Sequence, residues 1–412
     1  MSIGVSPESG SQVDVLVVGA GPAGSATATL LAGAGFSVLV VDRAAFPRDK
    51  ACSEYMSPEA VRILARLGVV EILERAGAFP LEGMKVTGPR GATAHGKFAL
   101  AGHHPFRPTG LSISRRILDH ELLAAARAAG AAVLERACVE ELLFERGSVA
   151  GAVLRDHTAQ RHSLRARLTV GADGLRSVVA RRLGRRSHGT SRRMAFVAHV
   201  ARVSNMGPSA ELHFRDSAYL GLNQIGHDKT NVALVVPSER AAYARGGVER
   251  FFAEAIAEFP GVRERVEAGE VVRPILATGP FAVWSPKVIA PGALLVGDAA
   301  DFFDPATGDG IYCALRGAEL VAETAAAALS QPGPVTVDRL VEYRRMRRQV
   351  FAGKRIIDRM IDYGLRFPRL FDRGVSRLGR HEHMAHTVIG LAGGFVPTRE
   401  VLNPVFLARM IL

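Results

Sequence analysis

The stretch between Val13 and Asp42 constrains the fold of this chain more than any other. It reads as an apolar strand, a glycine turn, an alanine-rich helix and a second apolar strand, which together predict a buried βαβ unit. In the turn, Gly19, Gly21 and Gly24 would allow a tight bend, close approach to a pyrophosphate and close helix–strand packing. Asp42 ends the second strand, where an acid can accept a hydrogen bond from a ribose. The pattern predicts a dinucleotide site rather than a helix that merely packs closely.

A second glycine-rich stretch, residues 294–318, lies far along the chain. It predicts a short apolar strand followed by Asp298, an acid that could accept hydrogen bonds from a sugar-alcohol hydroxyl. Pro305, Gly308 and Gly310 would bring bare backbone close to a flat ring at the start of a helix, whose positive end stabilises negative charge. A solvated surface loop is the alternative. Together with the first turn, this stretch indicates that both ends of a long cofactor such as FAD are held.

A third motif, Gly-Ala-Asp-Gly-Leu-Arg-Ser at 171–177, follows an apolar strand between the other two. Asp173 in this turn could direct its carboxylate and the neighbouring backbone at a ligand. An ordinary β-turn is the alternative, because Asp-Gly is among the commonest turn dipeptides.

The composition excludes several classes of function. Three scattered cysteines are too few for a disulfide framework or a zinc site, and no metal centre is predicted. The formal charge of +12 favours contact with anions, but no nucleic-acid-binding motif is present, so no nucleic-acid partner is expected. The uncharged run 15–41 is long enough to raise the question of a membrane span, yet its glycines and proline favour the buried βαβ unit. A polar N-terminus without a signal pattern predicts a cytoplasmic protein.

The pattern along the chain predicts an α/β fold with a second, inserted sheet. Helical periodicity covers 58–77 and 112–131, whereas residues 190–275 alternate in the manner of antiparallel strands. From about Val335 onward the pattern is helical and basic. We expect a Rossmann-like nucleotide-binding domain (13–80, 112–185 and 276–330), a substrate domain (81–111 and 186–275) and a helical C-terminal region (331–412).

In this order and spacing, GAGPAG with Asp42, GADGLRS and GDAADFFDPATGDGI resemble the three signatures of the flavoprotein hydroxylase fold. Members of that fold include p-hydroxybenzoate hydroxylase, flavin-dependent halogenases and geranylgeranyl reductases. The resemblance covers about residues 13–325 and implies FAD as cofactor and NAD(P)H as its reductant. It implies that the pyrophosphate lies at Gly19, Gly21 and Gly24, the adenosine ribose at Asp42 and the ribityl chain at Asp298. The other residues that it assigns to the cofactor or its handling are Arg43, Arg115, Asp173, Pro305, Gly308, Gly310 and Ile311.

The flavin side and the substrate side of the resemblance indicate different reactions. PATGDGIYCAL is closest in wording to the geranylgeranyl reductases, but their Cys-Gly-Gly after a lysine is replaced by Ala51-Cys52-Ser53-Glu54-Tyr55 after Lys50. Their Trp-x-Phe-Pro strand is absent, and so is the Trp-x-Trp-x-Ile-Pro segment of the halogenases. The resemblance favours an NAD(P)H-driven monooxygenase of an apolar natural-product substrate. The alternatives are reduction of C=C bonds in an isoprenoid or polyketide, and a carrier- or membrane-docking protein with structural FAD.

Cys52, Glu54 and Tyr55 are the candidate catalytic residues, because in this fold their loop passes near the flavin. Cys52 could donate a proton or simply pack, while Glu54 and Tyr55 could contact substrate or be ordinary loop residues.

The C-terminal run 344–380 mixes many arginines with large apolar residues. It could lie on a membrane surface, line a tunnel for an apolar substrate or pack one face on the catalytic domain. The expected partner is a small hydrophobic substrate, either free or carried by an acidic protein, and the expected location is the cytoplasm or the periphery of a membrane.

Overall fold

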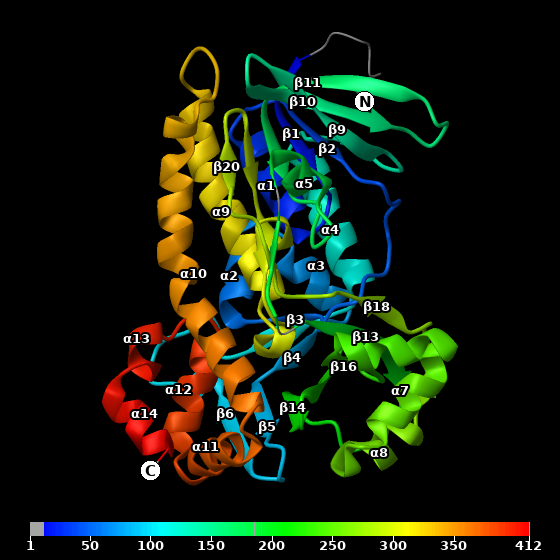
Figure 1. Ribbon diagram of the computed structural model, residues 1–412, viewed down its shortest axis with the longest axis vertical. Coiled ribbons are helices and arrows are strands. Elements are labelled where there is room, and N and C mark those ends of the chain that lie inside the picture. The colour runs from blue at the N-terminus through cyan, green and yellow to red at the C-terminus, as the bar shows by residue number, and fades with distance from the viewer. Residues whose placement is uncertain (1–11, 185, 191, 412) are drawn as a thin grey trace.

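A computed structural model describes residues 12–184, 186–190 and 192–411 (Figure 1). Its nucleotide-binding part is built on a mainly parallel sheet, whose parallel strands are Gln12–Val18 (β1), Val38–Val41 (β2), Ala132–Leu134 (β8), Arg161–Gly171 (β11) and Ala293–Leu295 (β21). They lie in the order β21–β11–β1–β2–β8. Antiparallel additions are Cys138–Glu145 (β9), Ser148–Arg155 (β10) and Ile289–Ala290 (β20).

The carboxyl ends of the parallel strands meet at one edge of this sheet. Val18 lies opposite Val41 on one side and Gly171 on the other, and Gly171 lies opposite Leu295. The three predicted motifs follow these strands, so they come together at this edge although they are distant in sequence.

Both faces of the sheet are buried, which explains why its strands are apolar throughout. Alternate residues such as Val17 and Leu16 enter separate cores on the two faces. The first core is completed by α1 and α9, with α4 beside α1 and α10 along α9. Those helices are Pro22–Gly33 (α1), Arg115–Ala128 (α4), Gly310–Leu329 (α9) and Val337–Leu365 (α10). The second core is covered by the β9–β10 hairpin and by Val178–Leu183 (α5).

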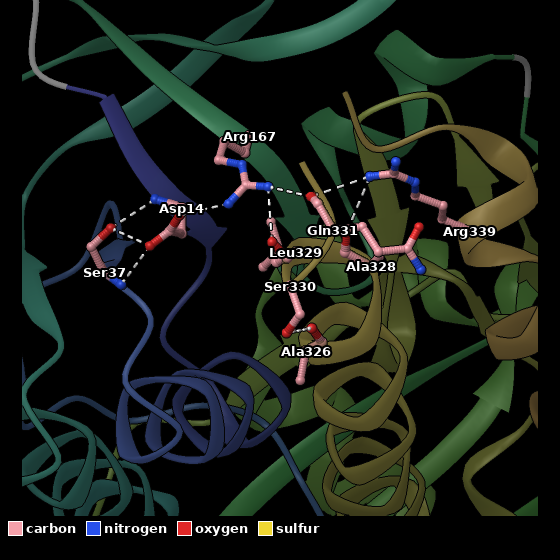
Figure 2. Close-up of polar contacts among 9 residues, drawn as sticks. All are labelled: Asp14, Ser37, Arg167, Ala326, Ala328, Leu329, Ser330, Gln331 and Arg339. Carbon is pink, nitrogen blue, oxygen red and sulfur yellow. Dashed lines mark hydrogen bonds and ion pairs between the residues drawn. The ribbon is translucent and has the colours of Figure 1, made fainter. Parts of the chain in front are cut away.

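Polar contacts fasten the opposite, amino edge of the sheet (Figure 2). The carboxylate of Asp14 accepts hydrogen bonds from the backbone N–H and the hydroxyl of Ser37, at 3.0 and 2.8 Å. Arg167 of β11 donates to Asp14 at 3.2 Å and to the carbonyl oxygens of Leu329 and Gln331 at 2.9 and 3.1 Å. These bonds join β1, β2, β11 and the end of α9 away from the motif-bearing edge.

A second sheet has the order β17–β13–β16–β15–β14–β5–β6, with β18 beside β13. Its strands are Gly83–Thr87 (β5), Thr93–Lys97 (β6), Arg193–Ala201 (β13), Ser209–Arg215 (β14), Ala218–Gln224 (β15), Lys229–Pro237 (β16), Glu270–Val271 (β17) and Leu276–Thr278 (β18). All neighbours are antiparallel except β5 and β14. One face packs on Ser238–Ala241 (α6), Val248–Ile256 (α7) and Pro260–Glu267 (α8), and the other faces the nucleotide-binding part. The predicted α/β class with an inserted sheet is confirmed.

Short elements connect the two parts. One small sheet contains Tyr55–Met56 (β3), Phe79–Leu81 (β4) and Gly110–Ser112 (β7), and another contains Ser187–His188 (β12), Val283–Trp284 (β19) and Asp301–Phe302 (β22). Single 3₁₀ turns lie at Phe98–Leu100, Ala242–Gly246, Gly297–Ala299 and Pro305–Thr307. The helix predicted over 58–77 is two helices, Pro58–Arg66 (α2) and Val70–Arg75 (α3), because Gly68 between them takes the left-handed φ of +73°.

The C-terminal region is helical, as the sequence predicts. After α10 come Pro368–Arg380 (α11), Glu382–Ala392 (α12), Thr398–Val401 (α13) and Pro404–Ile411 (α14). In Figure 1, α11 and α12 lie against β6, and the approach is close because a Cβ on Gly379 would lie 2.1 Å from the carbonyl oxygen of Thr93. Within the described ranges, no helix has the length and apolar character that a membrane span requires.

Candidate active site

The turn after β1 has a conformation that depends on glycine. Gly19 has a φ of +102°, and a Cβ there would lie 2.5 Å from the carbonyl oxygen of Ala172. A Cβ on Gly24 would lie 1.8 Å from the carbonyl oxygen of Gly19. The carboxylate of Asp42 accepts a hydrogen bond from the N–H of Ala20 at 2.7 Å and so fixes the turn. The turn presents the N-terminus of α1, whose free N–H groups favour an anion.

Two arginines converge in front of that helix terminus. A Cβ on Gly21 would lie 3.9 Å from Nη2 of Arg48 and 4.0 Å from Nη2 of Arg115. Asp119, one turn along α4, accepts from Arg115 at 2.7 Å and pairs with Arg48 at 3.0 Å. In the described part of the chain, the buried Nη1 of Arg48 has no partner. Sequence reasoning included Arg115 but missed Arg48 and Asp119, although the spacing of Arg115 and Asp119 is that of a helical ion pair.

The guanidinium of Arg115 also contacts the loop that carries the candidate catalytic residues. Burial alone would lower the pKa of Arg115, but Asp119, which accepts hydrogen bonds from the guanidinium, and the nearby sulfur of Cys52 raise the pKa above its ordinary value. Arg115 is therefore a permanent cation beside the helix terminus and the Cys52 thiol.

Asp298 lies at the same edge, after β21. Burial raises the pKa of Asp298, and the nearby Lys50 and Arg115 oppose that rise. Burial lowers the pKa of Lys50, and repulsion from Arg115 lowers it further. A buried acid beside cations can accept a hydrogen bond from a hydroxyl-bearing chain. Lys50 is a second residue that sequence reasoning did not assign to the site.

The loop 301–310, called the FAD loop below, passes close to Tyr55. Gly308 has a left-handed φ of +70°, and a Cβ there would lie 3.1 Å from Cδ1 of Tyr55. α9 begins at Gly310, so the N-terminus of a long helix points towards this loop.

Long-range contacts hold the FAD loop from two sides. Asp304 accepts hydrogen bonds from Tyr219 at 2.6 Å and from Arg193 at 2.8 Å, both on the second sheet. Asp309 forms an ion pair with Lys354 of α10. The loop is therefore positioned by the second sheet and by the C-terminal helices together.

An apolar cavity of about 180 Å³ lies between the FAD loop and the second sheet. Small and apolar residues of four strands form its roof: Ala195, Val197, Leu212, Gly221, Ala233 and Val235. Its opposite side includes much of the predicted cofactor set: Gly21, Arg115, Asp298, Pro305, Gly308, Gly310 and Ile311. The structure thus places these predicted residues around one cavity.

Two residues that line the cavity carry a buried polar atom without a hydrogen-bond partner in the described part of the chain. They are Tyr55, through its hydroxyl, and Asn223, through Nδ2. Tyr55 is only 2% exposed, and burial raises its pKa above the ordinary value. Because an unpaired buried donor is costly, both atoms favour a ligand with an acceptor at this place.

The three candidate catalytic residues occupy different positions. Cys52 and Tyr55 line the cavity, whereas Glu54 is fully buried behind it. The Glu54 carboxylate accepts from the backbone N–H of Arg115 at 2.8 Å and lies 2.7 Å from Nε2 of His199. Glu54 links α4 to β13 and does not line the cavity, which favours the alternative of a structural loop residue.

Asp173 and Arg43 also lie outside the cavity lining. Asp173 accepts hydrogen bonds from the hydroxyl of Ser177 at 2.5 Å and from the N–H of Val178 at 2.6 Å. These bonds cap α5 and favour the alternative of a structural turn. Arg43 is exposed next to Asp42.

Glu211, at the cavity, leads to a prediction about pH. Burial alone would raise the pKa of Glu211, but hydrogen bonds from His213 and Arg265 outweigh it and lower the pKa to about 2. Since the unfolded value is 4.5, the carboxylate adds stability that is present above pH 4.5 and lost as the pH falls towards 2. Glu211→Gln should lower the free energy of unfolding by about 2 kcal/mol at neutral pH and flatten this acid limb. Equilibrium denaturation across the acid range measures both effects.

Glu254→Gln, at an exposed position, is the control, and an unchanged acid limb in Glu211→Gln would contradict the assignment.

The donor set fits FAD. The glycine turn and the unpaired Nη1 of Arg48 suit a pyrophosphate, and Asp298 suits the ribityl hydroxyls. A family model described as "FAD binding domain" matches residues 12–358. This chain belongs to that family. It is an FAD-dependent oxidoreductase, as the three motifs together predict.

This flavoprotein is similar to several named reductases over about three quarters of its length. Menaquinone reductase of Mycolicibacterium smegmatis is 30% identical over 325 residues, which cover 76% of this chain and 76% of that protein. Digeranylgeranylglycerophospholipid reductase 1 of Methanococcoides burtonii is 28% identical over 330 residues, covering 78% and 76%. The crystal structure of a flavoprotein/dehydrogenase of Cytophaga hutchinsonii matches with a TM-score of 0.85 and 20% identity, covering 97% of this chain and 98% of that one. At that identity the last likeness shows the fold.

Proposed function

We propose that this flavoprotein reduces carbon–carbon double bonds in the apolar chain of an isoprenoid-type lipid. The observation that carries the proposal is the apolar cavity, which has the FAD loop on one side and small apolar side chains on the other. Two relatives that are named as reductases, one of a geranylgeranyl-bearing phospholipid and one of menaquinone, support it. We therefore rank reduction above monooxygenation, which the missing substrate-side features of the reductases had favoured.

Saturating a double bond requires a hydride on one carbon and a proton on the other. Reduced FAD would supply the hydride, and NAD(P)H is the proposed source of its electrons. The hydroxyl of Tyr55 would supply the proton, because it borders the cavity and has no competing hydrogen bond in the described part of the chain. Its raised pKa keeps it protonated at neutral pH. The side chain of Cys52 also lines the cavity and is the second candidate donor.

The roof of the cavity would select an apolar, branched chain. A Cβ on Gly221 would have no neighbour closer than 3.9 Å, so the middle of the roof is open. Burying a chain there gains about 25 cal/mol per Å² of apolar surface and excludes water from the reacting carbons. Nδ2 of Asn223 would donate to an oxygen at the polar end of the substrate.

Monooxygenation is the second candidate. The unpaired donors of Tyr55 and Asn223 could also orient an oxygen-bearing ring. The same cavity would then receive a ring in place of a chain.

Large apolar side chains are exposed where α10 meets α11, and they could contact a lipid surface that holds an apolar substrate. Tyr363, Phe367 and Leu370 are 60%, 47% and 43% exposed, whereas Phe351 and Leu365 are buried. One part of this region therefore packs on the catalytic domain, and we propose that the exposed part contacts a lipid surface.

Anaerobic turnover tests the proposed function. FAD-loaded enzyme reduced with dithionite should add a pair of hydrogens to each double bond of a polyprenyl lipid without O₂, as measured by mass spectrometry. A product that forms only after O₂ is admitted, and that gains an oxygen atom, would overturn reduction in favour of hydroxylation. Bound FAD with neither reaction would favour the third alternative, a docking protein with structural FAD.

A further inference from the structure

A groove separate from the apolar cavity lies between α10 and the small sheet of β12, β19 and β22. It encloses about 660 Å³, which is within the range of small-molecule and cofactor sites. Trp284 of β19 and the neighbouring Phe303 line it together with five arginines of α10, of which Arg347 is buried. We call it the arginine groove, after Arg344, Arg348, Arg355 and Arg359.

Acids also border the arginine groove, but inner cations already hold three of them, and the fourth, Asp358, is buried and accepts a hydrogen bond from Thr307. Asp301 accepts two hydrogen bonds from Arg347, at 2.5 and 3.1 Å. Asp304 and Asp362 pair with Arg193 at 2.8 and 2.9 Å. Arg347 and Arg193 are 7% and 5% exposed, so these pairs belong to the buried wall. The positive charges of the outer arginines are therefore largely not neutralised by these acids.

Three of the outer arginines are free to bind an anion. In the described ranges, no hydrogen bond or ion pair holds the guanidinium groups of Arg344, Arg348 and Arg359, and all three residues are exposed. Arg355 only reaches Asp301 at 4.0 Å. Their spacing keeps the four on one side of α10, and the helix rises about 22 Å between the first and the last. A row of guanidinium groups over that length fits a ligand with more than one phosphate.

The aromatic pair provides a flat surface beside these charges. The rings of Trp284 and Phe303 are stacked, with centroids 5.9 Å apart and planes at 21°. Both residues are partly exposed and line the arginine groove. Nucleotide bases stack on aromatic side chains, and neighbouring arginines add to that attraction.

The arginine groove also borders the FAD loop. Asp301 and Asp304 belong to both, and a smaller hollow lined by Asp298, Gly310 and Arg347 continues from the groove behind the loop. That hollow shares Asp298 and Gly310 with the lining of the apolar cavity, so it lies between the groove and the residues assigned to the flavin.

We propose that the arginine groove binds a nicotinamide dinucleotide, with its phosphates on the arginines of α10 and a base against Trp284 and Phe303. The inference rests on the proposed function, because a flavin reductase needs an electron donor and NAD(P)H is the one proposed. A phospholipid headgroup has the same phosphate chemistry, but it has no base for the aromatic platform. A dinucleotide has both the phosphates that the arginines would bind and the base that the aromatic pair would stack on.

The fluorescence of Trp284 tests this inference directly, because Trp284 is the single tryptophan of the chain. Oxidised NADP⁺ is titrated into FAD-loaded enzyme, so no electrons are exchanged. Saturable quenching is expected, and Arg344→Ala and Arg348→Ala should each raise Kd about tenfold or more. Arg345→Ala is the matched control, since Arg345 lies on the same helix, pairs with Glu342 and does not line the groove. Its Kd should equal that of the wild type.

Vesicles of phosphatidylglycerol, tested by co-sedimentation, form the second arm. NADP⁺ binding that is unaffected by Arg344→Ala and Arg348→Ala would overturn the inference. Vesicle binding that depends on these arginines, without any response to NADP⁺, would also overturn it and identify a lipid headgroup as the ligand. If dithionite-reduced enzyme reduces the double bonds of the lipid but NADP⁺ does not bind, only the groove assignment fails. If NADP⁺ binds as expected but no double bond is reduced, only the proposed function fails.

Discussion

Replacing Gly24 with alanine should abolish the binding of FAD. The added Cβ would lie 1.8 Å from the carbonyl oxygen of Gly19 and 3.2 Å from Cβ of Ala172, so α1 must move away from the turn. Overpacking of this kind costs about 1–3 kcal/mol. The pyrophosphate needs the turn and the helix terminus in their present relation. The ratio of FAD to protein after purification, measured by absorbance, should fall to near zero.

Gly33 in the same helix provides the matched control. A Cβ there meets no atom within 4 Å, and Gly33 does not line the cavity. Gly33→Ala should keep a full complement of FAD and raise the free energy of unfolding by up to about 1 kcal/mol. Full FAD occupancy in Gly24→Ala would show that the turn does not hold the cofactor in the way inferred.

Replacing Tyr55 with phenylalanine should slow double-bond reduction about 100-fold, because loss of a general acid typically costs about 10²–10⁴-fold. The hydroxyl makes no hydrogen bond in the described part of the chain, and the ring would keep its stacking on Phe98, with centroids 6.5 Å apart. FAD occupancy, flavin reduction and the free energy of unfolding should therefore remain as in the wild type. Anaerobic stopped-flow mixing of reduced enzyme with substrate measures the rate of the reducing step.

Tyr312→Phe serves as its control, because Tyr312 lies near the start of α9 and does not line the cavity. Its rate should match the wild type. An unchanged rate in Tyr55→Phe would exclude its hydroxyl as the proton donor, and Cys52→Ala would then test the second candidate donor at the cavity.

The cofactor motifs could be predicted because each depends on residues that are neighbours in the chain. The conformations at Gly19 and Gly308 have φ values of +102° and +70°, which glycine adopts readily, and the acid Asp298 follows its own strand. Parallel pairing then places these local motifs at one edge of the sheet without any further signal.

The groups that complete the site depend on contacts between distant segments. Arg48 meets Asp119 across separate elements, and Asp309 meets Lys354 only because α10 packs along α9. Glu54 is adjacent to two residues of the cavity lining, yet its partner His199 lies on the second sheet and draws the carboxylate away from the cavity. No local pattern encodes such pairings, so the sequence alone could not predict them.

At two other places the local sequence is compatible with more than one structure. The Asp-Gly turn at Asp173 serves equally well to bind a ligand or to cap a helix, and its bonds to Ser177 and Val178 cap α5. Gly68 lies within a helical apolar pattern, but its left-handed φ ends one helix before the next begins.

The most direct test of the central claim is the fate of the reduced flavin on anaerobic mixing with an unsaturated isoprenoid lipid. We predict that the visible absorbance of oxidised FAD returns without O₂, in proportion to the double bonds saturated, and that a fully saturated lipid of the same length produces no change. A flavin that stays reduced with both lipids until O₂ is admitted would contradict the assignment of this protein as a double-bond reductase.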